Sequence, residues 1–143
     1  MITTPKLTLA DARMILEGAE AKSRKIGVDM DIAVVDDGGH LLAFIRMDGA
    51  RLTSIDVSIN KAFTAACARR ATHEYAAIAG AGGPAFGMNT SNQGRFMIVG
   101  GGLPIFFRGA IVGGVGCSSG SAEQDREIAQ AGIDRLMSTL GDG

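Results

Sequence analysis

The sequence predicts an α+β sandwich in which helices flank a five-stranded antiparallel sheet, in the order α-β-β-α-α-β-β-β-α. Three observations predict it. Short apolar runs alternate with glycine-rich turns, as they do in antiparallel hairpins. Apolar residues at helical spacing follow helix-capping residues in several places. The length of 143 residues and the hydrophobic content of 46% suit a single domain, spanning 1–143, with one core.

The first third of the chain predicts a helix followed by a β-hairpin. Thr8 with Asp11 three residues later is the pattern of a capping box, and apolar residues then recur at helical spacing as far as Gly27. Two strand-like runs follow, at 32–35 and 40–47. Asp-Asp-Gly-Gly lies between them, and such a sequence is typical of a hairpin turn.

Two more helices are expected in the middle of the chain. Thr53 with Asp56 repeats the capping pattern, so a second helix should start there and bury one face. Thr72 can cap a short third helix that ends near Ala79.

The segment 80–94 is too rich in Gly, Asn, Ser and Pro to be a regular element, and a loop of this length is usually functional or disordered. Large apolar groups within it argue against plain disorder. Phe86, Gly87 and Met88 could wall one side of a ligand pocket, and Gly82 and Gly83 could offer backbone N–H groups to a ligand; the alternative is that these glycines only form tight turns.

Three apolar runs and a helix close the chain. The runs at 96–99, 104–107 and 110–117 are separated by short turns and predict an antiparallel meander. Ser121 with Gln124 then forms a capping box in front of an apolar stripe at helical spacing, which predicts the last helix.

The charge balance excludes several classes of partner. Lys and Arg number 14 against 15 Asp and Glu, for a net charge of −1, so a nucleic-acid partner is not expected. No stretch is apolar enough to span a membrane and no leader is visible, so a soluble cytoplasmic protein is expected. Cys67 and Cys117 lack metal-binding spacing, and no metal site is predicted.

Dispersed motifs occur along almost the whole chain: the hairpin with Asp36, Gly39 and RMDG at 46–49, KAFTA at 61–65, GGLP at 101–104 and SGSAEQD at 119–125. Together they resemble the GlcG/HbpS-like family, and the C-terminal domain of PduO-type corrinoid adenosyltransferases is similar too. The resemblance implies a profilin-like or PAS-like sandwich that assembles into homo-oligomers. It also implies a site for haem, a corrinoid or another small molecule.

Arg46 and Lys61 are the most informative polar residues. Each lies among apolar neighbours, where a cation is costly unless an anion meets it, so both are candidates to bind a carboxylate or a haem propionate. The alternative is that Arg46 pairs with Asp48 or Asp56 while Lys61 reaches solvent along an apolar surface.

Three further residues are candidates with structural alternatives. His40 and His73 are the only histidines, and either could ligate a metal or haem iron, although a lone histidine is more often a surface or hydrogen-bonded residue. Glu123 suits the first turn of the last helix, where acids complement the helix dipole, but it could instead face the pocket of a neighbouring subunit.

These candidates leave three hypotheses. The first is a homo-oligomeric protein that binds haem, another tetrapyrrole or a small carboxylated metabolite through Arg46, Lys61 and the 80–89 loop. The alternative is a catabolic isomerase or lyase acting on a small organic or aromatic acid, with Lys61 or His73 transferring a proton and Arg46 holding the carboxylate. The third is a structural subunit without a ligand.

Overall fold

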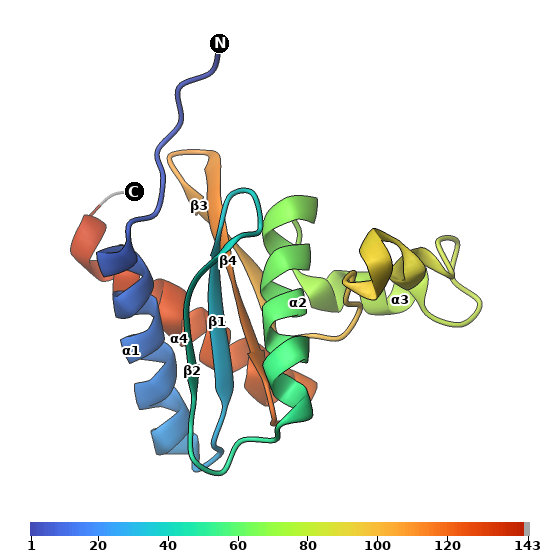
Figure 1. Cartoon of the computed structure of the whole chain (residues 1–143), viewed down its shortest axis with the longest axis horizontal. Coiled ribbons are helices and arrows are strands. Elements are labelled where there is room, and N and C mark those ends of the chain that lie inside the picture. The colour runs from blue at the N-terminus through green and yellow to red at the C-terminus, as the bar shows by residue number, and fades with distance from the viewer. Residues whose placement is uncertain (142–143) are drawn as a thin grey trace.

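The computed structural model describes residues 1–141 and has three layers (Figure 1). Its elements are α1 (Leu9–Ile26), β1 (Asp31–Asp36), β2 (Leu41–Arg46), α2 (Thr53–Ala68), η1 (Thr72–Glu74), α3 (Tyr75–Ala79), η2 (Met88–Thr90), η3 (Asn92–Gly94), β3 (Gly102–Phe107), β4 (Ala110–Ser118) and α4 (Ala122–Leu140). The strands form one antiparallel sheet in the order β2-β1-β4-β3. Helices α1 and α4 pack on one face of the sheet and α2 packs on the other.

Local sequence signals set both ends of α1 and the start of α4. The capping boxes of Thr8 with Asp11 and of Ser121 with Gln124 both form, and Gly27 ends α1 in the left-handed conformation. The expected cap at Thr53 is wrong, because Thr53 is already helical and Leu52 precedes it without a side-chain cap. No helix among residues 1–141 combines the length and the apolar character needed to cross a membrane.

The glycines of β4 explain how α2 lies on the sheet. A Cβ atom at Gly116 would overlap the carbonyl oxygen of Ser58, and one at Gly114 would come within 2.5 Å of the Ala62 carbonyl oxygen. Without side chains at these positions, the backbone of α2 rests directly on the strand. This close approach fixes the height of α2 above the sheet, and therefore the position of every side chain on that helix.

The α+β class and the antiparallel sheet are as predicted, but within residues 1–141 the sheet has four strands instead of five. The apolar run at 96–99 is not a strand. Thr64 holds it against α2, since its Oγ1 accepts from the Met97 amide at 2.9 Å. The Thr64 hydroxyl proton has the Asn60 carbonyl oxygen at 2.8 Å and the Arg95 carbonyl oxygen at 3.2 Å as acceptors. The Phe96 ring lies edge-on to Tyr75 with 4.9 Å between centroids, so side chains of helices anchor this segment.

Candidate functional site

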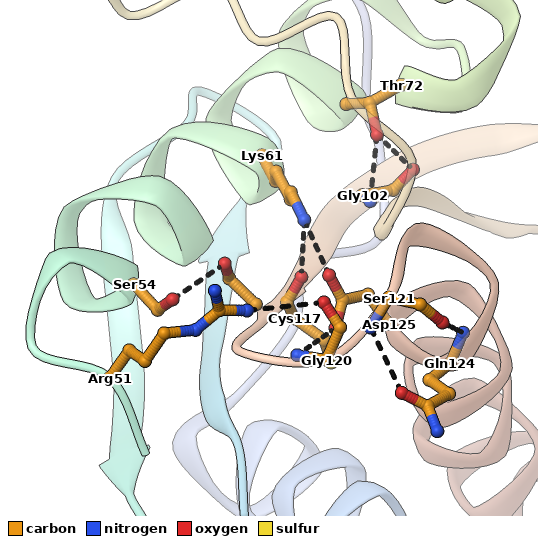
Figure 2. Close-up of polar contacts among 11 residues, drawn as sticks. Arg51, Ser54, Lys61, Thr72, Gly102, Cys117, Gly120, Ser121, Gln124 and Asp125 are labelled. Carbon is orange, nitrogen blue, oxygen red and sulfur yellow. Dashed lines mark hydrogen bonds and ion pairs between the residues drawn. The ribbon is translucent and has the colours of Figure 1, made fainter. Parts of the chain in front are cut away.

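Lys61 lies in a closed polar cluster instead of an open pocket. Its side chain is 2% exposed, and its Nζ donates to Asp125 Oδ2 at 3.0 Å and to the Cys117 carbonyl oxygen at 2.9 Å (Figure 2). The other oxygen of Asp125 accepts the Gly120 amide at 3.0 Å. The ammonium group therefore joins α2, β4 and the first turn of α4, and both charges are compensated inside the protein.

The glycine pair at 101–102 makes room for this lysine. Gly101 has a φ of +123°, and a Cβ there would lie 2.8 Å from the Lys61 Nζ. A Cβ at Gly102 would lie 2.5 Å from the Lys61 carbonyl oxygen, and the Gly102 amide donates to Thr72 Oγ1 at 2.9 Å. The turn thus packs against Lys61, whose side chain extends to Asp125.

Arg46 is exposed at the end of β2 and borders an open cavity of about 260 Å³. The lining carries both signs of charge, with Glu20, Arg24, Asp29 and Asp48 around Ile45 and Met47. Within residues 1–141, Arg46 has no ion pair with either Asp48 or Asp56. Its position leaves the guanidinium free to meet an anion from outside the chain.

Asp31, the strand neighbour of Arg46, is fully buried, and neither of its carboxylate oxygens has a hydrogen-bond partner among the described residues. Burial raises the pKa of Asp31 above its ordinary value, and the charge of Arg46 opposes this only in part. The carboxyl group is therefore a cost to the fold whenever it is ionised.

Asp31→Asn should remove part of the pH dependence of stability. Because the pKa of Asp31 is higher in the folded than in the unfolded protein, the wild-type free energy of unfolding should fall as pH rises above 3.8 through the raised pKa. The variant should lack this loss and gain about 1–3 kcal/mol relative to wild type between about pH 4 and pH 7. Urea unfolding at both pH values measures this difference in the free energy of unfolding. Asp134→Asn, at an exposed position, serves as control. Equal pH dependence in wild type and Asp31→Asn would contradict it.

The other predicted site residues lie apart from one another in a single chain. Gly82, Gly83, Phe86, Gly87 and Met88 lie in the segment beyond α3, outside the sandwich, where Phe86 is 71% exposed. Glu123 is exposed on the first turn of α4 and borders an open groove of about 570 Å³, together with Lys22, Arg126 and Glu127. The structure therefore does not bring Arg46, the loop and Glu123 into one pocket.

The two histidines have different environments. His40 is exposed, and its Nδ1 lies 3.2 Å from Asp36 Oδ1 at the hairpin turn. His73 on η1 is half-buried, and its Nδ1 is enclosed without a hydrogen-bond partner in the described chain. Burial lowers the pKa of His73, and the nearby positive charge of Arg126 lowers it further, so the ring is neutral at neutral pH.

An open site that the sequence did not predict lies around Phe63 on α2. The guanidinium of Arg95 stacks 3.8 Å above the centre of the Phe63 ring, and its Nε donates to Asn60 Oδ1 at 3.4 Å. Asn60 is itself held by Asp56, to which it donates at 3.1 Å. No carboxylate among residues 1–141 forms an ion pair with Arg95, so its remaining donors are available to a ligand.

Two cavities adjoin this stacked pair and share Phe63 and Asn92 in their lining. The smaller, of about 130 Å³, is lined by Phe63, Thr64, Cys67, Ala68, Asn92 and Phe96. The larger and more open one, of about 440 Å³, is lined by Phe63, Asn92, Gln93 and Arg95. We refer to the surface made by all these residues as the Phe63 face. It combines aromatic rings, amides and one cation.

The backbone is strained where it borders the Phe63 face. Asn92, Gln93 and Gly94 have φ values of 54°, 60° and 78°, so three successive residues are left-handed and two of them are not glycine. Each such non-glycine residue costs on the order of 1 kcal/mol or more, and strain of this kind concentrates at functional sites. One sequence signal could have pointed here, since Arg95 is the only charged residue between Glu74 and Arg108.

Comparison with known proteins gives consistent matches. The family model described as haem degrading protein HbpS-like matches residues 7–134. An uncharacterised 15.0 kDa protein of Citrobacter freundii, from the dhaT-dhaS intergenic region, is 44% identical over 128 residues, which are 90% of each chain. Klebsiella pneumoniae protein ORFY has a solved structure with a TM-score of 0.93 and 38% identity, covering 95% of this chain and 94% of that one. A PduOC:haem complex has a TM-score of 0.88 and 31% identity, covering 92% and 95%.

Proposed function

Because this chain belongs to the haem degrading protein HbpS-like family, we propose that it binds haem or a related tetrapyrrole. A relative of similar fold, PduOC, forms a complex with haem, which supports this ligand class. A small carboxylated metabolite is the other ligand that the same cationic site would accept.

The observation that carries the proposal is the Arg95 guanidinium stacked on Phe63 beside two open cavities. Haem is a flat apolar ring with two carboxylates at one edge. Because Arg95 covers one face of Phe63, a ring of this kind can lie against Phe96 and the edge of the stacked pair, where Arg95 can meet a propionate with its unpaired donors. Asn60 holds the Nε of Arg95, so the guanidinium is already oriented before a ligand arrives.

The residues around this surface include one group that can ligate iron. The Cys67 thiol lines the smaller cavity, and burial raises the pKa of this thiol above its ordinary value. Binding to the iron would displace the thiol proton, because a metal ion stabilises the thiolate. Haem held here would supply redox chemistry, while this chain orients the ring and its propionates.

Arg95→Gln should weaken haemin binding by about 10-fold to 100-fold, the loss expected for a charge-assisted hydrogen bond of about 1.5–3 kcal/mol. A titration of the purified protein followed by the Soret band measures it. Arg108→Gln is a matched control, since Arg108 also stacks on a phenylalanine, Phe107, at 4.9 Å but lies on the β3–β4 turn. Wild-type protein without a saturable Soret change would count against haem. An unchanged haemin affinity in Arg95→Gln would show that haem does not bind at Arg95.

The isomerase or lyase alternative has less support from the geometry. It needs Lys61 or His73 to transfer a proton to a substrate. Lys61 is 1% exposed and engaged by Asp125, so its amine does not reach a substrate in this conformation. His73 is neutral at neutral pH, and it is therefore the better candidate for a base if a reaction is found.

A further inference from the structure

The segment that follows α3 has the composition of a buried interface. Charged residues make up 20% of the chain, yet none lies between Tyr75 and Gly94. The cores of protein interfaces are depleted of charge in the same way and enriched in Phe and Met. We refer to residues 80–91 as the arm. It contains Phe86 and Met88 among small polar residues and glycines.

The arm keeps its own shape while it projects from the sandwich. Its backbone bonds are local, from the Ala85 amide to the Ile78 carbonyl (2.7 Å), from Gly83 to Gly80 (3.0 Å) and from Met88 to Ala85 (3.0 Å). In Figure 1 it extends beyond α3, on the side of α2 remote from the sheet. Phe86 is 71% exposed and Met88 is 38% exposed, although burying either would gain about 1.5–3 kcal/mol.

The Phe63 face offers a matching surface. The smaller cavity on this face is lined by two phenylalanines, a cysteine, an alanine, a threonine and an asparagine, none of them charged. The larger cavity is wide open, so a planar ligand bound beside the Phe63–Arg95 pair would have one side toward solvent. A binding site for an apolar ring normally encloses most of the ligand surface, and this site lacks its second wall.

We infer that the arm of one copy lies over the Phe63 face of a second copy, so that the partner subunit's Phe86 closes the ligand site. This inference rests on the proposed function for the ligand, and it adds that each site is built from two chains. In Figure 1 the tip of the segment beyond α3 projects from the sandwich, so the arm of a second copy can approach the Phe63 face from outside. The contact places the uncharged arm against the uncharged smaller cavity of the Phe63 face, and it buries the exposed Phe86 and Met88.

The first test is the double substitution Phe86→Ser with Met88→Ser, called here the arm variant. Both side chains are exposed in the single chain, so the fold should persist, as circular dichroism can verify. Light scattering should show a lower mass than for wild type at the same concentration, and haemin affinity should fall by about tenfold or more. Leu52→Ser, an exposed apolar residue before α2, is the control and should change neither quantity. An arm variant with wild-type mass and wild-type affinity overturns the inference.

The second test asks whether the site is shared between chains. The arm variant and Arg95→Gln should each lose haemin binding when expressed alone. In a mixed oligomer, the intact Phe63 face of the arm variant can meet the intact arm of the Arg95→Gln chain. Co-expression with two affinity tags isolates such oligomers, and in a mixed dimer one of the two sites, about half in all, should regain binding. Absence of any restored Soret signal overturns a shared site. If wild type itself binds no haemin, the haem proposal fails, and the mass of the arm variant alone then decides the inference.

Discussion

Replacing Lys61 by methionine should lower the free energy of unfolding by about 3–5 kcal/mol. Methionine fills a similar volume but cannot donate, so the carboxylate of Asp125 would stay buried without its cation. The Cys117 carbonyl oxygen would lose its donor as well. Removing one partner of a buried ion pair costs far more than the pair itself contributes, because the remaining charge has lost its solvent.

Chemical denaturation of wild type and Lys61→Met measures this loss. Lys22→Met is the control, since Lys22 pairs with Glu127 at 3.2 Å on the surface and should change stability by less than about 1 kcal/mol. The double variant Lys61→Met with Asp125→Leu should regain much of the stability, because no unpaired charge is left inside. A single variant as stable as wild type would show that the cluster does not hold α2, β4 and α4 together.

The lysine also shows what the sequence could and could not predict. Its place near the buried face of α2 follows from helical spacing, and so does the conclusion that an anion must meet it. The identity of that anion does not follow, because Asp125 is 64 residues away and looks like an ordinary first-turn acid. The position fitted a ligand anchor equally well from the sequence alone, whereas the structure places the anion inside the protein.

The same distinction explains the Phe63 face and the missing fifth strand. The capping boxes at Thr8 and Ser121 and the hairpin turn are local, and those predictions are confirmed. Arg95 meets Asn60 across 35 residues, so its role needs the fold. The run at 96–99 is apolar enough for a strand, but Thr64 supplies the partners that a neighbouring strand would have given. An apolar pattern predicts that a segment is buried, but it does not specify whether a neighbouring strand or a helix covers it.

The chain contains 21 glycines, and in β4 the reason for them is steric. In the loops, glycine predicts turns. In the interior of a strand, glycine is destabilising because of its backbone entropy, so the sequence alone does not explain why it occurs there. Their neighbours in the fold supply the reason. Gly114 and Gly116 face the backbone of α2, so the strand accepts a destabilising residue in exchange for close helix packing.

Gly116→Ala should therefore destabilise the protein by about 3 kcal/mol or more, at the upper end of overpacking effects. The added methyl would overlap the Ser58 carbonyl oxygen and lie 2.5 Å from the Ala62 amide nitrogen. Both atoms belong to the helix backbone, so no side chain can rotate away and α2 would have to move as a unit. That movement would also pull Lys61 away from Asp125, and the two effects should not be independent.

Thermal and urea unfolding of Gly116→Ala measure the loss, with Gly38→Ala as the control. At Gly38 the new Cβ would meet mainly the exposed ring of His40, which can turn aside, so little change is expected. In the Lys61→Met background the glycine substitution should cost less than it does in wild type, because the ion pair that it would disturb is already gone. If the losses in unfolding free energy from Gly116→Ala and Lys61→Met are strictly additive, the packing of α2 on β4 is independent of the buried ion pair. If Gly116→Ala is as stable as wild type, the helix backbone does not rest on the strand.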